Sequence, residues 1–318
     1  MFTMLFYMYA EPWLGQGPVW YSITNKKMCE DYWWTNILYI NNFYPVNNIQ
    51  GCIPWVWYLA NDMQFHWISP LIILPMYKKP WFGIGMLAQF LLASVIVTGV
   101  LIGYFDLSGA LFTGGAVNLI PTDQPNFFDI VYTKPYCRIA PYLTGMALGF
   151  FMQRNKNIQI RNRNLISILG WVAATAIAVS VVYGLYRTSH GYELSTAEEI
   201  IYGSLSRFAW SISVAWVVFA CHYGMAGLAN TILSWPFWIP LSRLTYSAYL
   251  FHPIVLDVLV FNFAVPFHYT FNIIVFLFLG VTLMSYGVAA LAFLAVELPM
   301  ANIEKVIEDR INKIKKEK

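Results

Sequence analysis

The chain contains seven long apolar stretches, each of which is long enough to cross a membrane as a helix. A transmembrane helix needs about 20 mostly apolar residues, and a run such as FLLASVIVTGVLIGYF is apolar on every side. A membrane β-barrel would instead show strands of about ten residues with alternating polarity, so the helical interpretation is favoured. The predicted spans are 54–77, 81–105, 136–153, 165–186, 199–221, 241–263 and 271–297.

The composition excludes several other classes of protein. Of the 318 residues, 58% are apolar and 11% are charged, whereas a soluble globular domain carries roughly 25% charged residues. An ordinary soluble enzyme and an intrinsically disordered chain are therefore excluded, and the net charge of +3 offers no basic face for nucleic acid. We expect an all-α membrane protein, a polytopic transmembrane helix bundle whose surroundings are membrane lipids.

The first ten residues, MFTMLFYMYA, are apolar but too few to span a bilayer. They lack the basic residue and the clear cleavage site of a signal peptide, so we favour a partial helix over a signal-peptide core. The expected architecture is about seven full spans plus a partial N-terminal helix.

Lysine and arginine are distributed unevenly between the two sets of loops. Twelve lie in 78–79, 154–163 and 305–318, whereas the alternate loops hold only four together with nine acidic residues. Because cytoplasmic loops are enriched in Lys and Arg, we predict a cytoplasmic C-terminus, in the plasma membrane or an endomembrane. The basic tail 304–318 is either a short helix on the anionic leaflet or a solvated segment.

Two of the four cysteines, Cys29 and Cys52, fall in the first predicted outer loop. That side is oxidising in a secretory-pathway membrane, so we expect a disulfide between them. Cys137 and Cys221 are expected to be single buried thiols.

Charged side chains within the spans are candidate functional residues, because each costs on the order of 2.5–3.5 kcal/mol near a helix centre. Asp62 and His66 are four apart, and so share one helix face, where the carboxylate can fix the imidazole tautomer. Arg207 is expected at a depth similar to that of Asp62 and Asp257. An ion pair with either carboxylate would offset the cost of burial, and a purely structural pair is the alternative to a functional one.

A second polar cluster is LSRLTYSAYLFHPIV, in which Tyr246 and Tyr249 precede His252 and Pro253 follows it. Proline removes a backbone hydrogen bond and can bend the helix where the imidazole is presented. A functional histidine and a satisfied core histidine are both open at this point.

Arg243 and Glu297 are expected at the inner membrane surface, on consecutive antiparallel helices. We favour an interfacial ion pair between them over an Arg243 that receives an anionic cytoplasmic group such as a phosphate. The sequence contains no zinc pattern, Walker loop, dinucleotide fingerprint or Gly-x-Ser-x-Gly elbow, so no metal or bound cofactor is expected.

Three segments resemble the acyltransferase 3 family of membrane proteins, and more narrowly its nose-resistant-to-fluoxetine branch. They are YWWTNILYINNF at 32–43, WYLANDMQFHWISP at 57–70 and LSRLTYSAYLFHPIV at 241–255. The family pattern Trp-Ser-Leu-x-x-Glu-x-x-Phe-Tyr is matched by Trp57, Leu59 and Phe65, with Asp62 in place of Glu and His66 in place of Tyr. The pattern Ser-Tyr-x-x-Tyr-Leu-x-His is matched by Tyr246, Tyr249, Leu250 and His252, with Thr245 in place of Ser.

The resemblance covers the transmembrane region 1–303, and the family's first spans, with their histidine and arginine, are not in this sequence. It implies transfer of an acyl group from a cytoplasmic donor, acyl-CoA as co-substrate, to a hydroxyl on a lipid or another acceptor. The candidate catalytic residues are Asp62, His66, Arg207 and His252. The candidate substrate-binding residues are Trp57, Gln64, Arg243, Tyr246, Tyr249 and Asp257.

Two alternatives stay open at this stage. A lipid or drug transport protein of the same fold would use the polar interior as a passage, and helices interrupted at Pro70, Pro75 or Pro253 would favour it. A fragment without activity is the other alternative.

Overall fold

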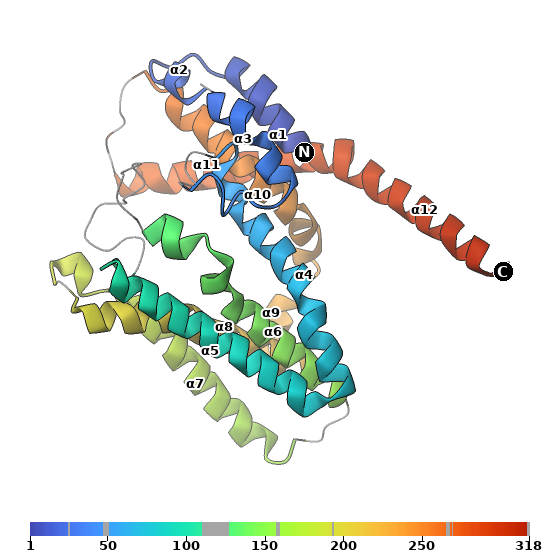
Figure 1. Cartoon of the computed structure of the whole chain (residues 1–318). Coiled ribbons are helices and arrows are strands. Elements are labelled where there is room, and N and C mark those ends of the chain that lie inside the picture. Colours follow the sequence, from blue (N-terminus) through green and yellow to red (C-terminus); the bar gives the residue numbers. More distant parts are fainter. Residues whose placement is uncertain are drawn as a thin grey trace. The chain divides into compact units, whose positions relative to one another are not determined.

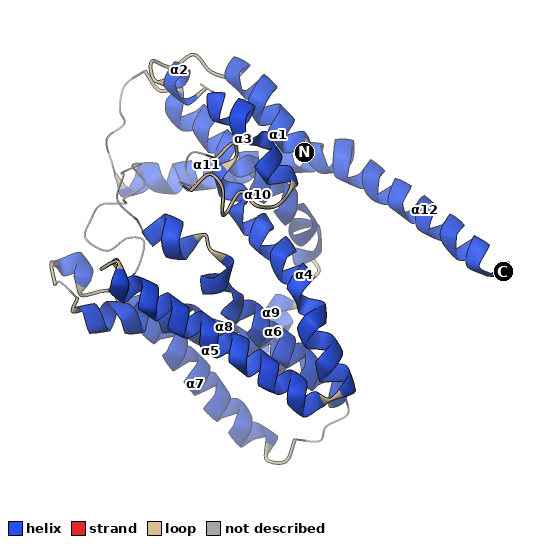
Figure 2. Ribbon diagram, in the orientation of Figure 1, coloured by secondary structure: helices blue, strands red, loops and turns tan. Residues whose placement is uncertain are grey.

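The computed structural model describes residues 1–24, 26–46, 51–109, 127–156, 160–192, 194–264, 268 and 270–316. In this part of the chain all regular structure is helical and no strand occurs (Figure 2). The longer helices are α3 Lys27–Ile37, α4 Trp57–Lys78, α5 Pro80–Tyr104, α6 Pro135–Arg154, α7 Arg163–Tyr183, α8 Thr196–His222, α10 Trp238–Phe261, α11 Phe271–Ala292 and α12 Leu298–Lys316 (Figure 1). The shorter ones are α1 Phe2–Leu5, α2 Trp20–Ile23 and α9 Leu228–Leu233.

The prediction of a helical membrane protein is confirmed. Among the described residues, five helices are long and apolar enough to cross a membrane: α5, α7, α8, α10, and the continuous helix Phe271–Lys313. The other two predicted spans also form single helices, α4 with 22 residues and α6 with 20, but their sequences are more polar. The chain is therefore an integral membrane protein.

Predicted and observed helix boundaries agree to within a few residues, and the largest differences have local causes. Helix α8 begins at Thr196, three residues before the predicted position, because a capping box precedes it. Ser195 Oγ accepts a hydrogen bond from the Glu198 backbone N–H at 3.4 Å, and Glu198 accepts one from the Ser195 N–H at 2.9 Å. At the other end of the chain, a π-helical turn, Phe293–Glu297, joins α11 to α12 without a break. Within the basic tail, residues 304–313 are thus helical and exposed.

The chain divides into two compact units, with one boundary inside α3 and the other after α9. Unit 2 comprises residues 34–233, and its longest helix, α8, packs against α5, α6 and α7. Its main apolar core joins α4, α5 and α6 through Phe65, Ile72, Leu87 and Leu143.

Unit 1 comprises residues 1–33 and 234–318 and is built on the packed pair α10 and α11. The N-terminal residues are held against α10 by aromatic contacts, with the Phe6 and Phe251 ring centroids 5.6 Å apart. Gly17 allows the chain to pass directly over the Phe261 carbonyl group, because a Cβ atom at this position would collide with that oxygen. This packing brings the first residues of the chain beside α10.

Candidate functional site

In unit 2 the face of α4 that carries Asp62 and His66 is exposed. The two side chains lie one turn apart, as predicted, but they do not hydrogen-bond to each other among the contacts of the described residues. Of the two pairings considered for Arg207, the one with Asp62 is not formed among the described residues. The charged groups that act on the Tyr58 hydroxyl are Asp62 and Arg138. Arg207 is on α8, and its side chain is turned toward α6 and Phe127.

The side chain of Gln64 forms hydrogen bonds with other residues of unit 2. Its Nε2 donates to the Tyr39 carbonyl oxygen at 2.8 Å and to Asn42 Oδ1 at 2.9 Å, and its Oε1 accepts from Asn42 Nδ2 at 3.0 Å. Asn42 also donates to Asn61 Oδ1 at 2.7 Å, and Asn61 donates to the Thr133 carbonyl oxygen at 3.0 Å. This network joins the 39–46 segment, α4 and the segment before α6, so Gln64 positions the backbone around the site.

Lys134 completes this network by donating from Nζ to the Asn42 carbonyl oxygen. Burial lowers the pKa of Lys134, and the nearby charge of Asp129 opposes that effect. The sequence indicated only an outer-loop cation at this position. Its burial depends on contact with a segment 92 residues away.

Trp57 contributes a ring face to a buried guanidinium. The Arg138 carbon Cζ lies 4.9 Å from the Trp57 ring centroid and 4.2 Å from that of Tyr132, and Arg138 Nε donates to the Tyr132 carbonyl oxygen at 2.7 Å. On α8, the guanidinium of Arg207 lies 5.8 Å from the Phe127 ring. Each of the two guanidiniums has a buried Nη nitrogen that lacks a hydrogen-bond partner, Nη2 of Arg138 and Nη1 of Arg207.

In unit 1, His252 and Tyr249 lie on the wall of a groove of about 580 Å³ between α10 and α11. The other lining residues are mostly apolar, such as Leu256, Leu277 and Val281. His252 Nδ1 lies 2.9 Å from the Tyr249 carbonyl oxygen, one turn earlier on α10. The imidazole is thus fixed by the backbone and presented to an apolar space.

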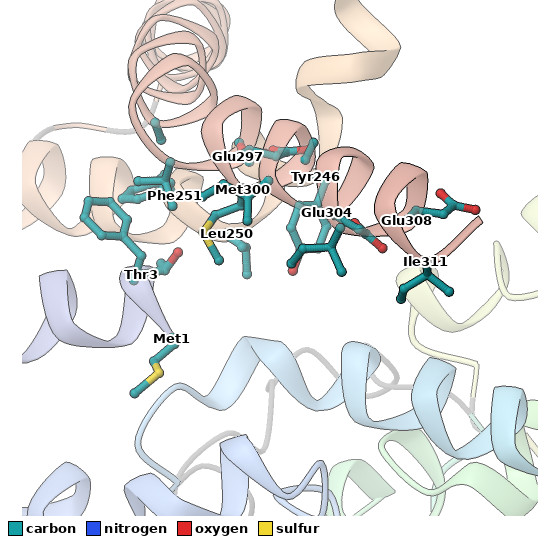
Figure 3. A pocket seen from close by; sticks show the side chains of 17 residues that line it. Met1, Thr3, Tyr246, Leu250, Phe251, Glu297, Met300, Glu304, Glu308 and Ile311 are labelled. Carbon is teal, nitrogen blue, oxygen red and sulfur yellow. The ribbon is translucent and has the colours of Figure 1, made fainter. Parts of the chain in front are cut away.

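Tyr246 lies in a second groove of unit 1, of about 1030 Å³, formed by α10, α12 and the first residues of the chain. Figure 3 shows this groove, with Tyr246 and Leu250 from α10 and Met300 and Glu304 from α12 along its walls. The two tyrosines of the sequence motif, Tyr246 and Tyr249, therefore line different grooves.

The expected ion pair between Arg243 and Glu297 is not formed among the described residues. Glu297 Oε2 instead accepts a hydrogen bond from Ser247 Oγ at 2.8 Å. Arg243 is exposed at the first turns of α10. Ser247 lies one helical turn closer to the π-helical turn of Glu297, which is the physical reason for the different partner.

Asp257 faces the N-terminal segment of unit 1. It acts electrostatically on Glu11 and Lys26, which form an ion pair with 2.5 Å between Glu11 Oε2 and Lys26 Nζ. The Glu11 side chain is completely buried, and Lys26 also lies 3.3 Å from the centroid of the Tyr7 ring. Sequence reasoning missed this ion pair because both residues lie outside the predicted spans.

Cys29 and Cys52 are disulfide-bonded. The free thiols of the described residues are Cys137, which is buried, and Cys221, which is half-buried. The same residues contain no group of three or more His, Cys, Asp and Glu side chains that could hold a metal ion.

The fold and these polar groups define a polytopic helical membrane protein that holds charged side chains among its helices. The chain is related to the protein Nose resistant to fluoxetine protein 6 of Caenorhabditis elegans, with 30% identity over 315 residues. It is also similar to Regulator of hypoxia-inducible factor 1 of the same organism, with 22% identity over 275 residues.

The two alignments cover 96% and 82% of this chain. The chain spans 38% of the length of the first relative and 52% of the second. No protein-family model matches the sequence, and no solved structure matches it.

Proposed function

We propose that the chain is the catalytic membrane region of an O-acyltransferase of the acyltransferase 3 family. It would move an acyl group from acyl-CoA to a hydroxyl group on a lipid or another acceptor. The observation that carries this proposal is the imidazole of His252, which is hydrogen-bonded at Nδ1 and presented to the apolar groove between α10 and α11. The motif around His252 and the similarity to Nose resistant to fluoxetine protein 6 support the same assignment.

The hydrogen bond defines the tautomer of His252. A carbonyl oxygen can only accept, so Nδ1 carries the hydrogen in its 2.9 Å contact with Tyr249. In the neutral ring the lone pair is then on Nε2, which makes this atom the general base.

In the proposed reaction, the imidazole of His252 is the only group that carries the proton. Nε2 of His252 removes the proton of the acceptor hydroxyl as its oxygen attacks the thioester carbonyl carbon. The new carbon–oxygen bond forms, the carbon–sulfur bond breaks, and the proton passes from the imidazolium to the departing thiolate of CoA. The apolar walls of the groove suit the acyl chain, and they exclude water, which would otherwise compete as an acceptor.

Asp62 and His66 of unit 2 remain candidate residues on the strength of the sequence motif, and they lie exposed on one face of α4.

The alternative of a transport protein has less support. It draws on the name of the first relative, which refers to fluoxetine. Interrupted helices at the prolines were its expected sign, but α4 runs through Pro70 and Pro75 and α10 runs through Pro253 as continuous helices.

The experiment measures transfer of labelled acyl groups from acyl-CoA to membrane lipids by the full-length gene product. His252→Gln keeps a polar side chain but no general base, and we expect its rate to fall about 10²–10⁴-fold. His222→Gln, at the end of α8, is the matched control and should retain the wild-type rate. Equal rates in wild type and His252→Gln would exclude His252 as the base, and flux into vesicles without an acyl product would favour transport.

A further inference from the structure

Arg138 on α6 and Arg207 on α8 are two cations within the helix bundle of unit 2. Neither forms an ion pair with a carboxylate among the described residues. Nη2 of Arg138 and Nη1 of Arg207 are buried and have no hydrogen-bond partner. Buried donors of charged groups are normally paired, because the loss of their hydration is not otherwise compensated.

The faces of both guanidiniums are covered by aromatic rings of one short segment. Tyr132 lies over Arg138 and Phe127 lies over Arg207, with centroid distances of 4.2 and 5.8 Å. Trp57 covers Arg138 further, at 4.9 Å. An aromatic ring stabilises a guanidinium by covering its planar face. It does not accept hydrogen bonds from the N–H groups at the edge of the guanidinium, which still need acceptors.

The two side chains are also close enough to repel each other. Helices α6 and α8 pack together and are joined by a hydrogen bond from Ser211 Oγ to Thr144 Oγ1 at 3.0 Å. The charge of Arg138 acts on Arg207, and the charges of both arginines act on the thiol of Cys137. Repulsion between like charges is strong where water is excluded, and it is relieved by an anion that both can contact.

We propose that Arg138 and Arg207 together bind a phosphate oxyanion, provided either by a lipid headgroup or by free phosphate. Phosphate has several acceptor oxygens and matches the planar fork of the arginine side chain, so it can accept from both edges at once. This inference concerns binding alone and is independent of acyl transfer by His252.

The experiment measures the thermal unfolding of the purified full-length gene product in a maltoside detergent. One arm adds inorganic phosphate, a second adds short-chain phosphatidic acid, and a third adds chloride at equal ionic strength. A ligand that binds the folded state raises the unfolding temperature in a concentration-dependent way. We expect one of the two phosphate probes to do so for the wild type, and the responding probe identifies the source of the anion.

Arg138→Gln and Arg207→Gln should each weaken binding of that probe at least tenfold. In the absence of phosphate they should unfold at the same temperature as the wild type or above it, because each removes one of two repelling charges. Arg161→Gln, an exposed arginine after α6, is the matched control and should behave as the wild type.

Arg207→Lys keeps the charge and should retain weaker binding, which covers the case in which a glutamine variant does not fold. The proposal is overturned if neither probe stabilises the wild type. It is overturned equally if the foldable variants, including Arg207→Lys, bind the probe as tightly as the wild type does.

Discussion

Glu11 and Lys26 form an ion pair with 2.5 Å between Oε2 and Nζ, and the Glu11 side chain is completely buried. Asp257, on α10, acts electrostatically on both members. The pair therefore joins the N-terminal segment of unit 1 to a helix that lies more than 200 residues further along the chain.

The two members of this pair should respond differently to removal. Lys26→Met leaves the carboxylates of Glu11 and Asp257 together without their cation, and we expect a loss of about 3–5 kcal/mol in the free energy of unfolding. Glu11→Gln leaves Lys26 with Asp257 as its remaining partner, so its loss should be smaller. Thermal unfolding of the purified chain measures both, with the exposed Lys305→Met as control. The reverse order of the two variants would contradict the role given to Asp257.

The Glu11 carboxyl should also make stability depend on pH. Burial raises the pKa of Glu11, and the hydrogen bond and charge of Lys26 oppose that effect only in part. A carboxyl whose pKa is higher in the folded state stabilises the protein below its unfolded pKa of about 4.3, and this contribution is lost as the pH rises through the folded pKa. The stability of wild type relative to Glu11→Gln should therefore be greater near pH 4 than near pH 7. A difference that does not vary with pH would refute this assignment.

The hydrogen-bond network around Asn42 and Asn61 in unit 2 should contribute to the stability of the folded protein. Asn61→Ala removes one of the two acceptors of Asn42 Nδ2 and the donor to the Thr133 carbonyl oxygen. Unsatisfied buried polar groups cost about 1–3 kcal/mol each, so the unfolding temperature should fall clearly. Asn312→Ala, on the exposed surface of α12, should leave it unchanged. An Asn61→Ala protein as stable as the control would show that the network contributes little.

The groove at His252 can be tested by filling it. Val281 lines the groove, whereas Leu283, two residues further along α11, is 78% exposed on another face of the helix. Val281→Trp should reduce acyl transfer for long-chain donors more than for short-chain donors, because the added ring occupies space needed by the chain. Leu283→Trp should have little effect. Equal inhibition for all donor lengths would argue against an acyl-binding groove.

The orientation expected from the positive-inside rule is open to a labelling experiment. Single cysteines introduced at Lys313 and at Arg187 should react with impermeant reagents from opposite sides of the membrane. The cytoplasmic side is predicted for Lys313. Labelling of both from the same side would contradict the predicted topology.

The sequence by itself determined the class of protein and the positions of the helices, because runs of apolar residues are local features. The predicted span 81–105 became α5, Pro80–Tyr104, with only one residue of difference at each end. A local signal that the prediction passed over, the Ser195–Glu198 capping box, accounts for the earlier start of α8. The exposed residues of α4 and the fixed imidazole of His252 also lie on the helices that the sequence assigned to them.

The tertiary structure alone decided the partners of the polar groups. Arg207 lies near Arg138 and not in an ion pair with Asp62, Glu297 bonds to Ser247 and not to Arg243, and Gln64 is joined to Asn42. Depth and helical spacing restrict which residues can meet, but the rotation of each helix about its axis selects among them. That rotation is determined by the packing of residues far apart in the chain, such as Asn61 against Thr133, which no local pattern in the sequence reveals.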